Sequence, residues 1–308
     1  MTSKNIFKPL SKGAAYKNAL IKRYPDGSYQ ITVFSRPTYK AGGLERSDAD
    51  EAAQRRHDLR AAHADLMNNT KNVDPRERTD NLRRAKQAIY DLAALNEWRY
   101  FITLTLDGEH IDRYNPAQIV KPVTKWLDNM VQRRDLQYMI VPEYHKDGAI
   151  HFHGLINGDL RLADSGTVKV HGRKKPIKRA TARKQKLDEG ELETVYNIDD
   201  YKLGFSSAIS IYGERDTLAK YMTKYITKDL QKIFGRRYWA GGKALRRKPP
   251  SVALDLKFDA IPEPEHPLPD DLGAVKYYKA PSREALNDFL NVVLQAPLTP
   301  SEARGLFQ

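Results

Sequence analysis

The stretch EYHKDGAIHFHGLI, residues 143–156, holds three of the chain's eight histidines in a pattern that predicts two strands and a tight turn. Apolar and β-branched residues flank the polar HKDG segment, so residues 136–144 and 149–157 are expected to pair as an antiparallel hairpin. Side chains two residues apart in a strand point to the same side. His151 and His153 therefore project from one face of the sheet, and the apolar residues that alternate with them face the core.

The length of the turn decides whether Glu143 joins the two histidines. A two-residue turn would direct the Glu143 side chain to the apolar face. A three-residue loop over 146–148, with Gly148 in the left-handed conformation, pairs Glu143 with His151 instead. We favour this register because it buries no carboxylate in the core. His145 shares the polar face, as a reserve ligand or as a partner of the ligands.

Two neutral imidazoles and one carboxylate form a donor set for a divalent metal ion with open coordination positions. Glu143, His151 and His153 are therefore candidate metal ligands. A phosphate substrate would favour Mg²⁺ or Mn²⁺, whereas the ligands alone also suit zinc. The alternative is a polar strand edge that binds no metal, because His-x-His triplets arise by chance.

The segment YMTKYITKD, residues 221–229, has the spacing of an amphipathic helix. Tyr221 and Tyr225 lie one turn apart on one stripe, and Lys224 and Lys228 each follow a tyrosine by three residues. A tyrosine hydroxyl attacks well only as the phenolate, and a nearby lysine or a metal-held substrate favours that anion. This spacing suits a phenolic nucleophile; ordinary helix packing is the alternative.

The composition favours an anionic partner. The 308 residues include 52 Lys and Arg against 39 Asp and Glu, a net charge of +13, which is typical of nucleic-acid-binding proteins. The absence of cysteine excludes disulfides, cysteine-ligated zinc and thiol nucleophiles. No secretory signal and no membrane-spanning apolar run is visible, so we expect a cytoplasmic protein without a membrane partner.

The remaining pattern predicts an α+β fold with a mostly antiparallel sheet. The expected elements are a hairpin over 18–35, two helices over 47–97, strands over 98–106 and 204–213, and helices over 116–134, 216–234 and 283–294. We expect three parts: the hairpin and basic helices over 1–97, packed on the core; a core over 98–248; and a proline-rich connection with a short helix over 249–308. The basic segment 169–189 is either a solvated, disordered insertion or a phosphate-contacting arm.

Three motifs follow one another in a distinctive order: FITLTL at 101–106, HFHGLI at 151–156 and YMTKYITKD at 221–229. Together they resemble the motifs of rolling-circle replication initiators of the HUH endonuclease superfamily. The chain is most similar to the bacterial phage and plasmid initiators with two motif tyrosines, including the filamentous-phage gene II type. The resemblance covers residues 98–240, and the hairpin and the basic helix before it also look like that group.

The resemblance implies an antiparallel sheet of about five strands with helices on one face, the ferredoxin-like or RRM-like arrangement of HUH endonucleases. His151 and His153 match the metal-binding pair, and Glu143 matches the third ligand. Tyr221 and Tyr225 match the nucleophiles of that family.

The other motif positions are less decisive. Lys228 matches the motif lysine, but Lys224 stands at the same distance after the other tyrosine. Motif geometry therefore leaves the lead nucleophile open, and the YITKD sequence favours Tyr225. Thr103 and Thr105 match small polar positions and receive no catalytic role.

The resemblance also implies a reaction on single-stranded DNA at a replication origin, at a hairpin or nick site. A divalent ion polarises the scissile phosphate, and one tyrosine attacks to form 5′-phosphotyrosyl DNA with a free 3′-hydroxyl that primes a polymerase. The second tyrosine cleaves the regenerated origin, and attack by a 3′-hydroxyl rejoins the strand. The sequence contains no P-loop motif, so a host helicase is expected to unwind the duplex.

Three other interpretations stay open. A transposase or relaxase of the same superfamily is the nearest, although relaxases usually carry the tyrosine near the N-terminus. A non-catalytic DNA-binding protein on the same fold would have lost the histidines or the tyrosines, and neither is lost. An unrelated metal-dependent nuclease would use water and form no covalent adduct.

Overall fold

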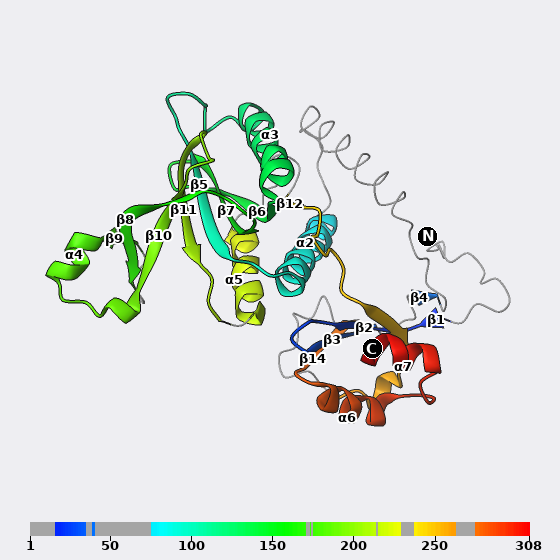
Figure 1. Cartoon of the computed structure of the whole chain (residues 1–308). Helices are drawn as coiled ribbons and strands as arrows, with labels where there is room; N and C mark the ends of the chain where they lie inside the picture. The colour runs from blue at the N-terminus through cyan, green and yellow to red at the C-terminus, as the bar shows by residue number, and fades with distance from the viewer. Residues whose placement is uncertain are drawn as a thin grey trace. The chain divides into compact units, whose positions relative to one another are not determined.

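The computed structural model describes residues 16–34, 39–40, 75–170, 173, 175–213, 215–228, 237–262 and 275–308. The chain forms two compact units (Figure 1). One unit is Ala52–Lys248, and the other combines Met1–Glu51 with Pro249–Gln308. Each is described by itself below.

The larger unit is built on one antiparallel sheet. Its strands are β5 (Tyr100–Leu106), β6 (Gln137–Tyr144), β7 (Ile150–Asn157), β8 (Leu162–Val170), β9 (Ile177–Lys178), β10 (Leu192–Ile198), β11 (Gly204–Ser210) and β12 (Trp239–Gly241). They form an eight-stranded sheet in the order β12-β6-β7-β5-β11-β10-β8-β9, and every neighbouring pair is antiparallel. The FITLTL and HFHGLI motifs therefore lie on adjacent central strands.

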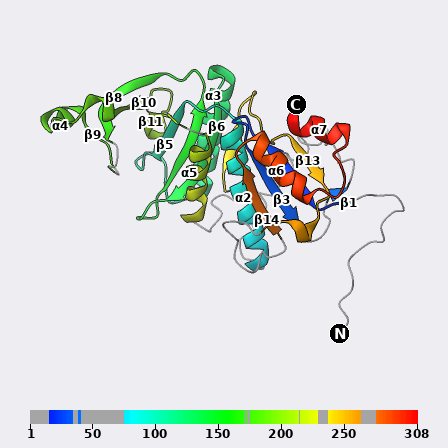
Figure 2. The same cartoon turned by 90° about the horizontal axis from the view of Figure 1, so that it is seen from below.

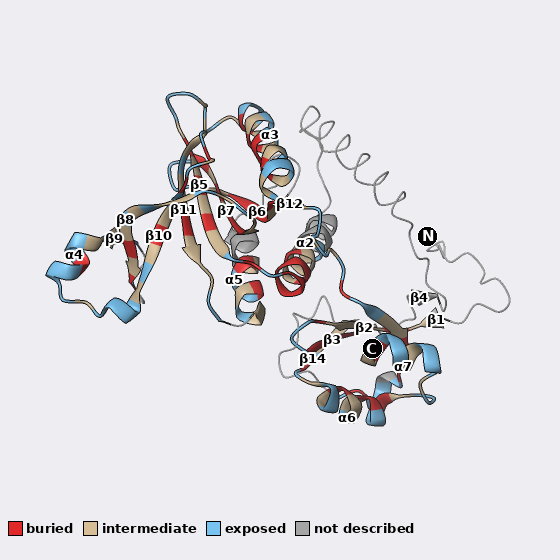
Figure 3. Ribbon diagram, in the orientation of Figure 1, coloured by how far each residue is buried: buried red, intermediate tan, exposed pale blue. Residues whose placement is uncertain are grey.

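One face of this sheet packs on helix α3 (Pro116–Arg134). Alternate strand residues such as Leu104 and Phe152 are fully buried in one cluster with Ile119 and Leu127 of the helix. Figure 3 colours the buried residues of these elements red. The Asn115 side chain accepts a hydrogen bond from a backbone N–H of the first turn, which satisfies one of the free donors there. The apolar stripe of α3 thus decides which strand residues form the core.

Helices α2 (Pro75–Leu95) and α5 (Arg215–Lys228) cover part of the opposite face. Phe101, whose side chain alternates with the core residues of β5, contacts the Tyr221 ring of α5. The Tyr90 hydroxyl of α2 donates to Asp216 of α5 over 2.6 Å, which joins the two helices. In Figure 1, α3 lies above the central strands, with α2 and α5 below them. None of the described helices is long and apolar enough to span a membrane.

The expected α+β class and antiparallel sheet are confirmed, and the arrangement is consistent with an HUH endonuclease fold. Two details differ from the expectation. The sheet has eight strands rather than about five. Helices cover both faces rather than one, because an apolar stripe predicts that a helix packs on a sheet without saying on which face.

The basic segment 169–189 adds one short strand to the sheet and extends another. It contains the end of β8, the strand β9 and the helix α4 (Arg179–Lys184), followed by the 3₁₀ turn η1 (Glu189–Glu191). Val168, Val170 and Ala182 are buried in this part of the structure. Most of its described lysines and arginines are exposed. Because they outnumber the few apolar residues, the alternating pattern of a strand is hard to recognise in the sequence. The described part of the segment is therefore folded into strand and helix, rather than being a disordered insertion or an irregular loop.

The smaller unit combines segments from both ends of the chain. Its strands β2 (Ala19–Arg23), β3 (Tyr29–Phe34), β13 (Ser251–Leu254) and β14 (Val275–Ala280) form a sheet in the order β13-β2-β3-β14. Helices α6 (Arg283–Val293) and α7 (Pro300–Phe307) pack against it, as Figure 2 also shows. The unit also holds the two-stranded pair β1 (Tyr16–Lys17) and β4 (Tyr39–Lys40), and the 3₁₀ turn η2 (Phe258–Ala260).

This division differs from the expected parts 1–97, 98–248 and 249–308. The predicted hairpin over 18–35 exists, but β2 pairs with β13 and β3 pairs with β14, so it does not join the central sheet. The 249–282 segment, expected as an extended connection, supplies those two strands. Helix α2 belongs to the unit of the central sheet. The first of the two helices expected over 47–97 lies outside the described residues.

Gly154 is expected to be essential for the central strand pairing. A Cβ atom at this position would collide with the Met139 carbonyl oxygen and lie 2.6 Å from Ile140 Cγ2 on the neighbouring strand. Because backbone cannot yield as a flexible side chain does, Gly154→Ala is expected to lower the free energy of unfolding by roughly 1–3 kcal/mol. Urea titration measures this change. Gly108→Ala is the matched control, since its Cβ would meet only the Arg113 side chain at ordinary contact distance.

Candidate functional site

The turn between β6 and β7 has the three-residue loop that the sequence favoured. The His145 N–H donates to the Ala149 carbonyl oxygen over 2.7 Å, which closes a loop over residues 146–148. Gly148 has a φ of 86°, in the left-handed region. As a result Glu143 pairs with His151 across the two strands, and the predicted register is confirmed.

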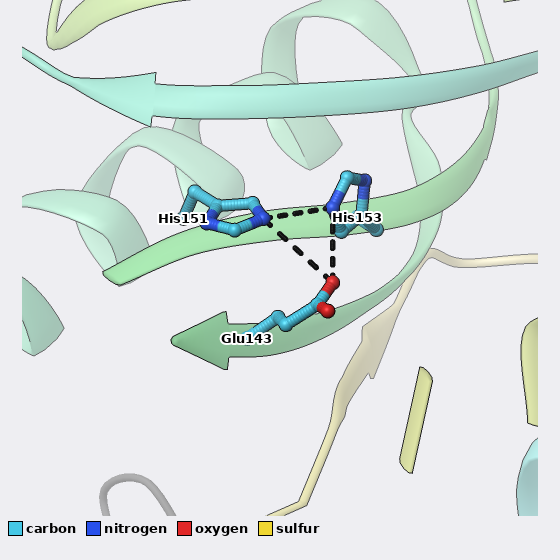
Figure 4. A group of neighbouring side chains, drawn as sticks. All are labelled: Glu143, His151 and His153. Carbon is cyan, nitrogen blue, oxygen red and sulfur yellow. Dashed lines mark hydrogen bonds and ion pairs between the residues drawn. The ribbon is translucent and has the colours of Figure 1, made fainter. Parts of the chain in front are cut away.

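Glu143, His151 and His153 converge on one point (Figure 4). The two Nε2 atoms are 2.9 Å apart, and Glu143 Oε2 lies 3.2 Å from His153 Nε2 and 3.7 Å from His151 Nε2. Two atoms that each bind one ion at about 2.1 Å, at a right angle, are about 3.0 Å apart. The three side chains therefore fit a divalent metal ion.

The surroundings of the two histidines differ. His151 Nδ1 is buried and has no hydrogen-bond partner among the described residues. His153 Nδ1 lies 3.1 Å from Thr103 Oγ1, on the adjacent strand β5. If Nε2 carries a lone pair toward a cation, Nδ1 carries the proton and donates it to Thr103. The hydroxyl therefore orients the ring and can accept the Nδ1 proton of the tautomer that binds metal.

His145 does not complete the ligand group. Its Nδ1 lies 3.2 Å from Asp147 Oδ1, and its ring meets the His151 ring edge to face. The Ala149 N–H that donates to Asp147, together with the charges of His145 and Arg113, lowers the pKa of this carboxyl group. His145 thus contacts a candidate ligand without being one itself, which agrees with the expectation that it is a partner of the ligands.

Helix α5 presents Tyr221 to the same side of the sheet. The Phe101 ring stacks on the His153 ring with 5.9 Å between the ring centroids, and it meets the Tyr221 ring edge to face with 5.6 Å between the centroids. One aromatic side chain therefore contacts both the histidine motif and the tyrosine motif. The Tyr221 side chain is 44% exposed. Lys224, Tyr225 and Lys228 belong to α5, but their side chains lie outside the described part of the structure.

Residues 99–230 match one family model. That model describes a replication-associated protein of the ORF2 and gene II protein type. The match runs from the start of β5 to the end of α5, and so contains each candidate ligand, tyrosine and lysine. No curated protein and no solved structure matches the chain. The match supports the general family that the motif order indicated, and with it a role in DNA replication.

Two residues of the matched segment gain contacts that sequence reasoning did not assign. Thr103 had no expected role, yet it holds His153. Phe101 was only a strand residue, yet it joins His153 to Tyr221. A partial signal existed, because alternation places both on the polar face of β5. The pairing of β5 with β7, which brings Thr103 opposite His153, is a contact between strands that are not consecutive along the chain.

Thr103→Val is expected to weaken divalent metal binding by about tenfold to a hundredfold, because it removes the acceptor for the His153 Nδ1 proton. A titration with Mn²⁺, followed by the electron paramagnetic resonance signal of the free ion, measures the change. Thr103→Ser should restore most of the affinity. Thr105→Val is the control, since Thr105 pairs with His151, whose Nδ1 accepts no bond from it. Equal affinities of the Thr103→Val and Thr105→Val proteins would remove this role.

Proposed function

We propose that this protein initiates rolling-circle replication by nicking single-stranded DNA at an origin through a tyrosine. The observation that carries the proposal is the convergence of Glu143, His151 and His153 on the sheet face against which the tyrosine helix packs. The replication-associated family match over residues 99–230 supports the same assignment. The protein is then a DNA-nicking and strand-transferring endonuclease.

The three ligands would hold Mg²⁺ or Mn²⁺. When bound, such an ion polarises a non-bridging oxygen of the scissile phosphate and favours attack at phosphorus. The side chains of the three ligands are only 12–15% exposed, so their positions are set by the strands before substrate arrives. Thr103 and Phe101 hold the His153 ring from two sides, which keeps the ligand atom in place.

Tyr225 is the lead nucleophile in this proposal. Near its start, α5 is tied to the segment just before β5, because the Arg215 guanidinium lies 2.9 Å from the Glu97 carboxylate. Further on, Tyr221 meets Phe101 of β5, so helix and strand advance in the same direction. One more helical turn advances about 6 Å, and two strand residues advance about the same distance. In this proposal, residue 225 would then lie level with Thr103, which pairs with His153.

The reaction of this tyrosine is a transesterification. The phenolic oxygen bonds to phosphorus as the bond from phosphorus to the 3′-oxygen breaks, and the phenolic proton passes to solvent. The DNA 5′-phosphate stays on the tyrosine, and the 3′-oxygen takes up a proton to become a free hydroxyl. Lys224 and Lys228 would favour the phenolate and offset negative charge on the phosphate. Tyr221 would act second, on the regenerated origin.

The partners follow from this chemistry. Single-stranded DNA at an origin hairpin or nick site is the substrate, and a host polymerase extends the 3′-hydroxyl. A host helicase, and the cytoplasm of a bacterial host as the location, belong to the same proposal. The chain's net charge of +13 suits a polyanionic substrate.

A denaturing gel tests the proposed function. The full-length protein is incubated with Mn²⁺ and labelled single-stranded oligonucleotides that tile the DNA around its own gene. We expect an oligonucleotide that is cleaved at one site and a labelled adduct that survives SDS. Both should disappear with EDTA. Cleavage without any adduct would identify a nuclease that uses water, and would overturn the proposal.

A further inference from the structure

We propose that Phe205 is a stacking platform for a DNA base next to the scissile phosphate. This inference rests on the proposed function and adds a binding residue to it. Phe205 pairs with Thr105, Thr105 pairs with His151, and His151 pairs with Glu143. These pairs cross four adjacent strands, so the four side chains form one row on one face of the sheet.

The Phe205 ring is 74% exposed although it has no polar atom. Single exposed apolar side chains are common and need no explanation by themselves. The other exposed aromatic side chains among the described residues are tyrosines, Tyr114, Tyr212 and Tyr221, whose hydroxyl groups suit water. Phe205 is therefore an exposed phenylalanine in the same row as the candidate metal-binding residues. A bound molecule with an apolar face would explain its position.

The described side chains beside the ring on β5 and β11 are small. Thr103, Thr105 and Ser207, which share the face on β5 and β11, are small and partly exposed. Helix α5 contacts this face at Phe101, whereas Phe205 lies level with Thr105, four residues further along β5. A planar group can therefore lie on the ring without displacing a described side chain of these strands.

The backbone beneath Phe205 is fixed. The Asp107 N–H donates to the Leu203 carbonyl oxygen over 2.9 Å, and Gly204 sits so close to β5 that a Cβ atom there would collide with the Thr105 carbonyl oxygen. The start of β11 is thus in close backbone contact with β5. Phe205 therefore extends from a hydrogen-bonded strand rather than from a loop. A preformed platform of this kind binds without a cost for ordering the protein strand itself.

The distance fits a nucleotide close to the nick. Phe205 is two strand spacings from His151, which is about 10 Å. A strand whose phosphate lies at the three ligands therefore brings a neighbouring base within reach of the ring. Aromatic side chains bind the faces of all four bases, so the platform would hold the strand without reading its sequence.

Binding of single-stranded DNA by the full-length protein in EDTA tests this inference, because no cleavage occurs there. The probe is a fifteen-nucleotide thymidine oligomer with one 2-aminopurine, whose fluorescence falls when it stacks. Phe205→Ala is expected to weaken binding by about tenfold. Phe205→Tyr should bind within about twofold of the original protein, since its ring keeps the stacking surface. Tyr212→Ala is the matched control, because this 77% exposed side chain lies beyond the end of β11.

The outcomes separate this inference from the proposed function. Equal affinity of the Phe205→Ala and original proteins overturns the platform, and an SDS-resistant adduct formed by the original protein would still support nicking. A tenfold loss in Phe205→Ala with recovery in Phe205→Tyr supports the platform even if no adduct forms. A similar loss in Tyr212→Ala would show a general surface effect and overturn the assignment. Thermal melting should be unchanged in each variant, because the replaced rings are exposed.

Discussion

Replacing His153 with alanine is expected to slow DNA nicking by about a thousandfold or more. The change removes one of three converging ligands and leaves Glu143 and His151 with too few donors to hold a divalent ion. A bound ion contributes several kcal/mol of transition-state stabilisation. Because about 1.4 kcal/mol corresponds to a tenfold change in rate, losing this contribution slows nicking about a thousandfold. Single-turnover cleavage of a labelled oligonucleotide in Mn²⁺ measures the rate.

The effect should be specific to the ligand group. His110→Ala is the control, because this exposed histidine belongs to a separate group with Asp107 and Glu109 after the end of β5, the other described group that could hold a metal ion. EDTA should slow the original protein as much as the His153 replacement does, which gives a test that does not depend on the folding of a variant. A His153→Ala protein that retains more than about a tenth of the original rate would contradict the metal assignment.

The double replacement Tyr221→Phe with Tyr225→Phe is expected to abolish covalent attachment to DNA. Each change removes one hydroxyl oxygen and keeps the ring, so the packing of Tyr221 on Phe101 is preserved. We expect Tyr225→Phe alone to cause most of the loss, and Tyr221→Phe alone to leave a first nick. The yield of SDS-resistant adduct should fall by at least about a thousandfold in the double variant.

Controls for this prediction are available in the same chain. Tyr212→Phe removes a hydroxyl from an exposed tyrosine outside α5 and should leave the adduct yield unchanged. Binding of single-stranded DNA in EDTA should also be unchanged in the double variant, because the rings remain. An adduct that persists in the double variant would show that another side chain attacks.

The candidate ligand group could be predicted because its geometry is local. His151 and His153 are two residues apart in one strand. Glu143 reaches them through a turn of two possible lengths, and the observed one is the one that buries no carboxylate. Thr103 is different, because it meets His153 only after β5 and β7 pair. An alternating pattern shows that Thr103 faces a polar side of a sheet, but it does not show which strand lies next to it.

The need to know which distant strands pair also limited the prediction of the fold. The hairpin over 18–35 is local and was predicted, but its partners β13 and β14 begin more than 200 residues later. Such short strands carry little signal of their own. The helix that carries Tyr221 was predicted from its apolar spacing, whereas its packing on the histidine face follows from the whole fold.

Peptide mapping of the covalent adduct tests the central claim most directly. Trypsin cleaves after Lys220, Lys224 and Lys228, so the two tyrosines fall in separate peptides, YMTK and YITK. After nuclease trimming of the adduct, mass spectrometry reads which peptide carries a nucleotide through its 5′-phosphate. We predict that the nucleotide is on residues 225–228 after the first nick. Cleaved DNA together with two unmodified tyrosine peptides would contradict nicking by tyrosine.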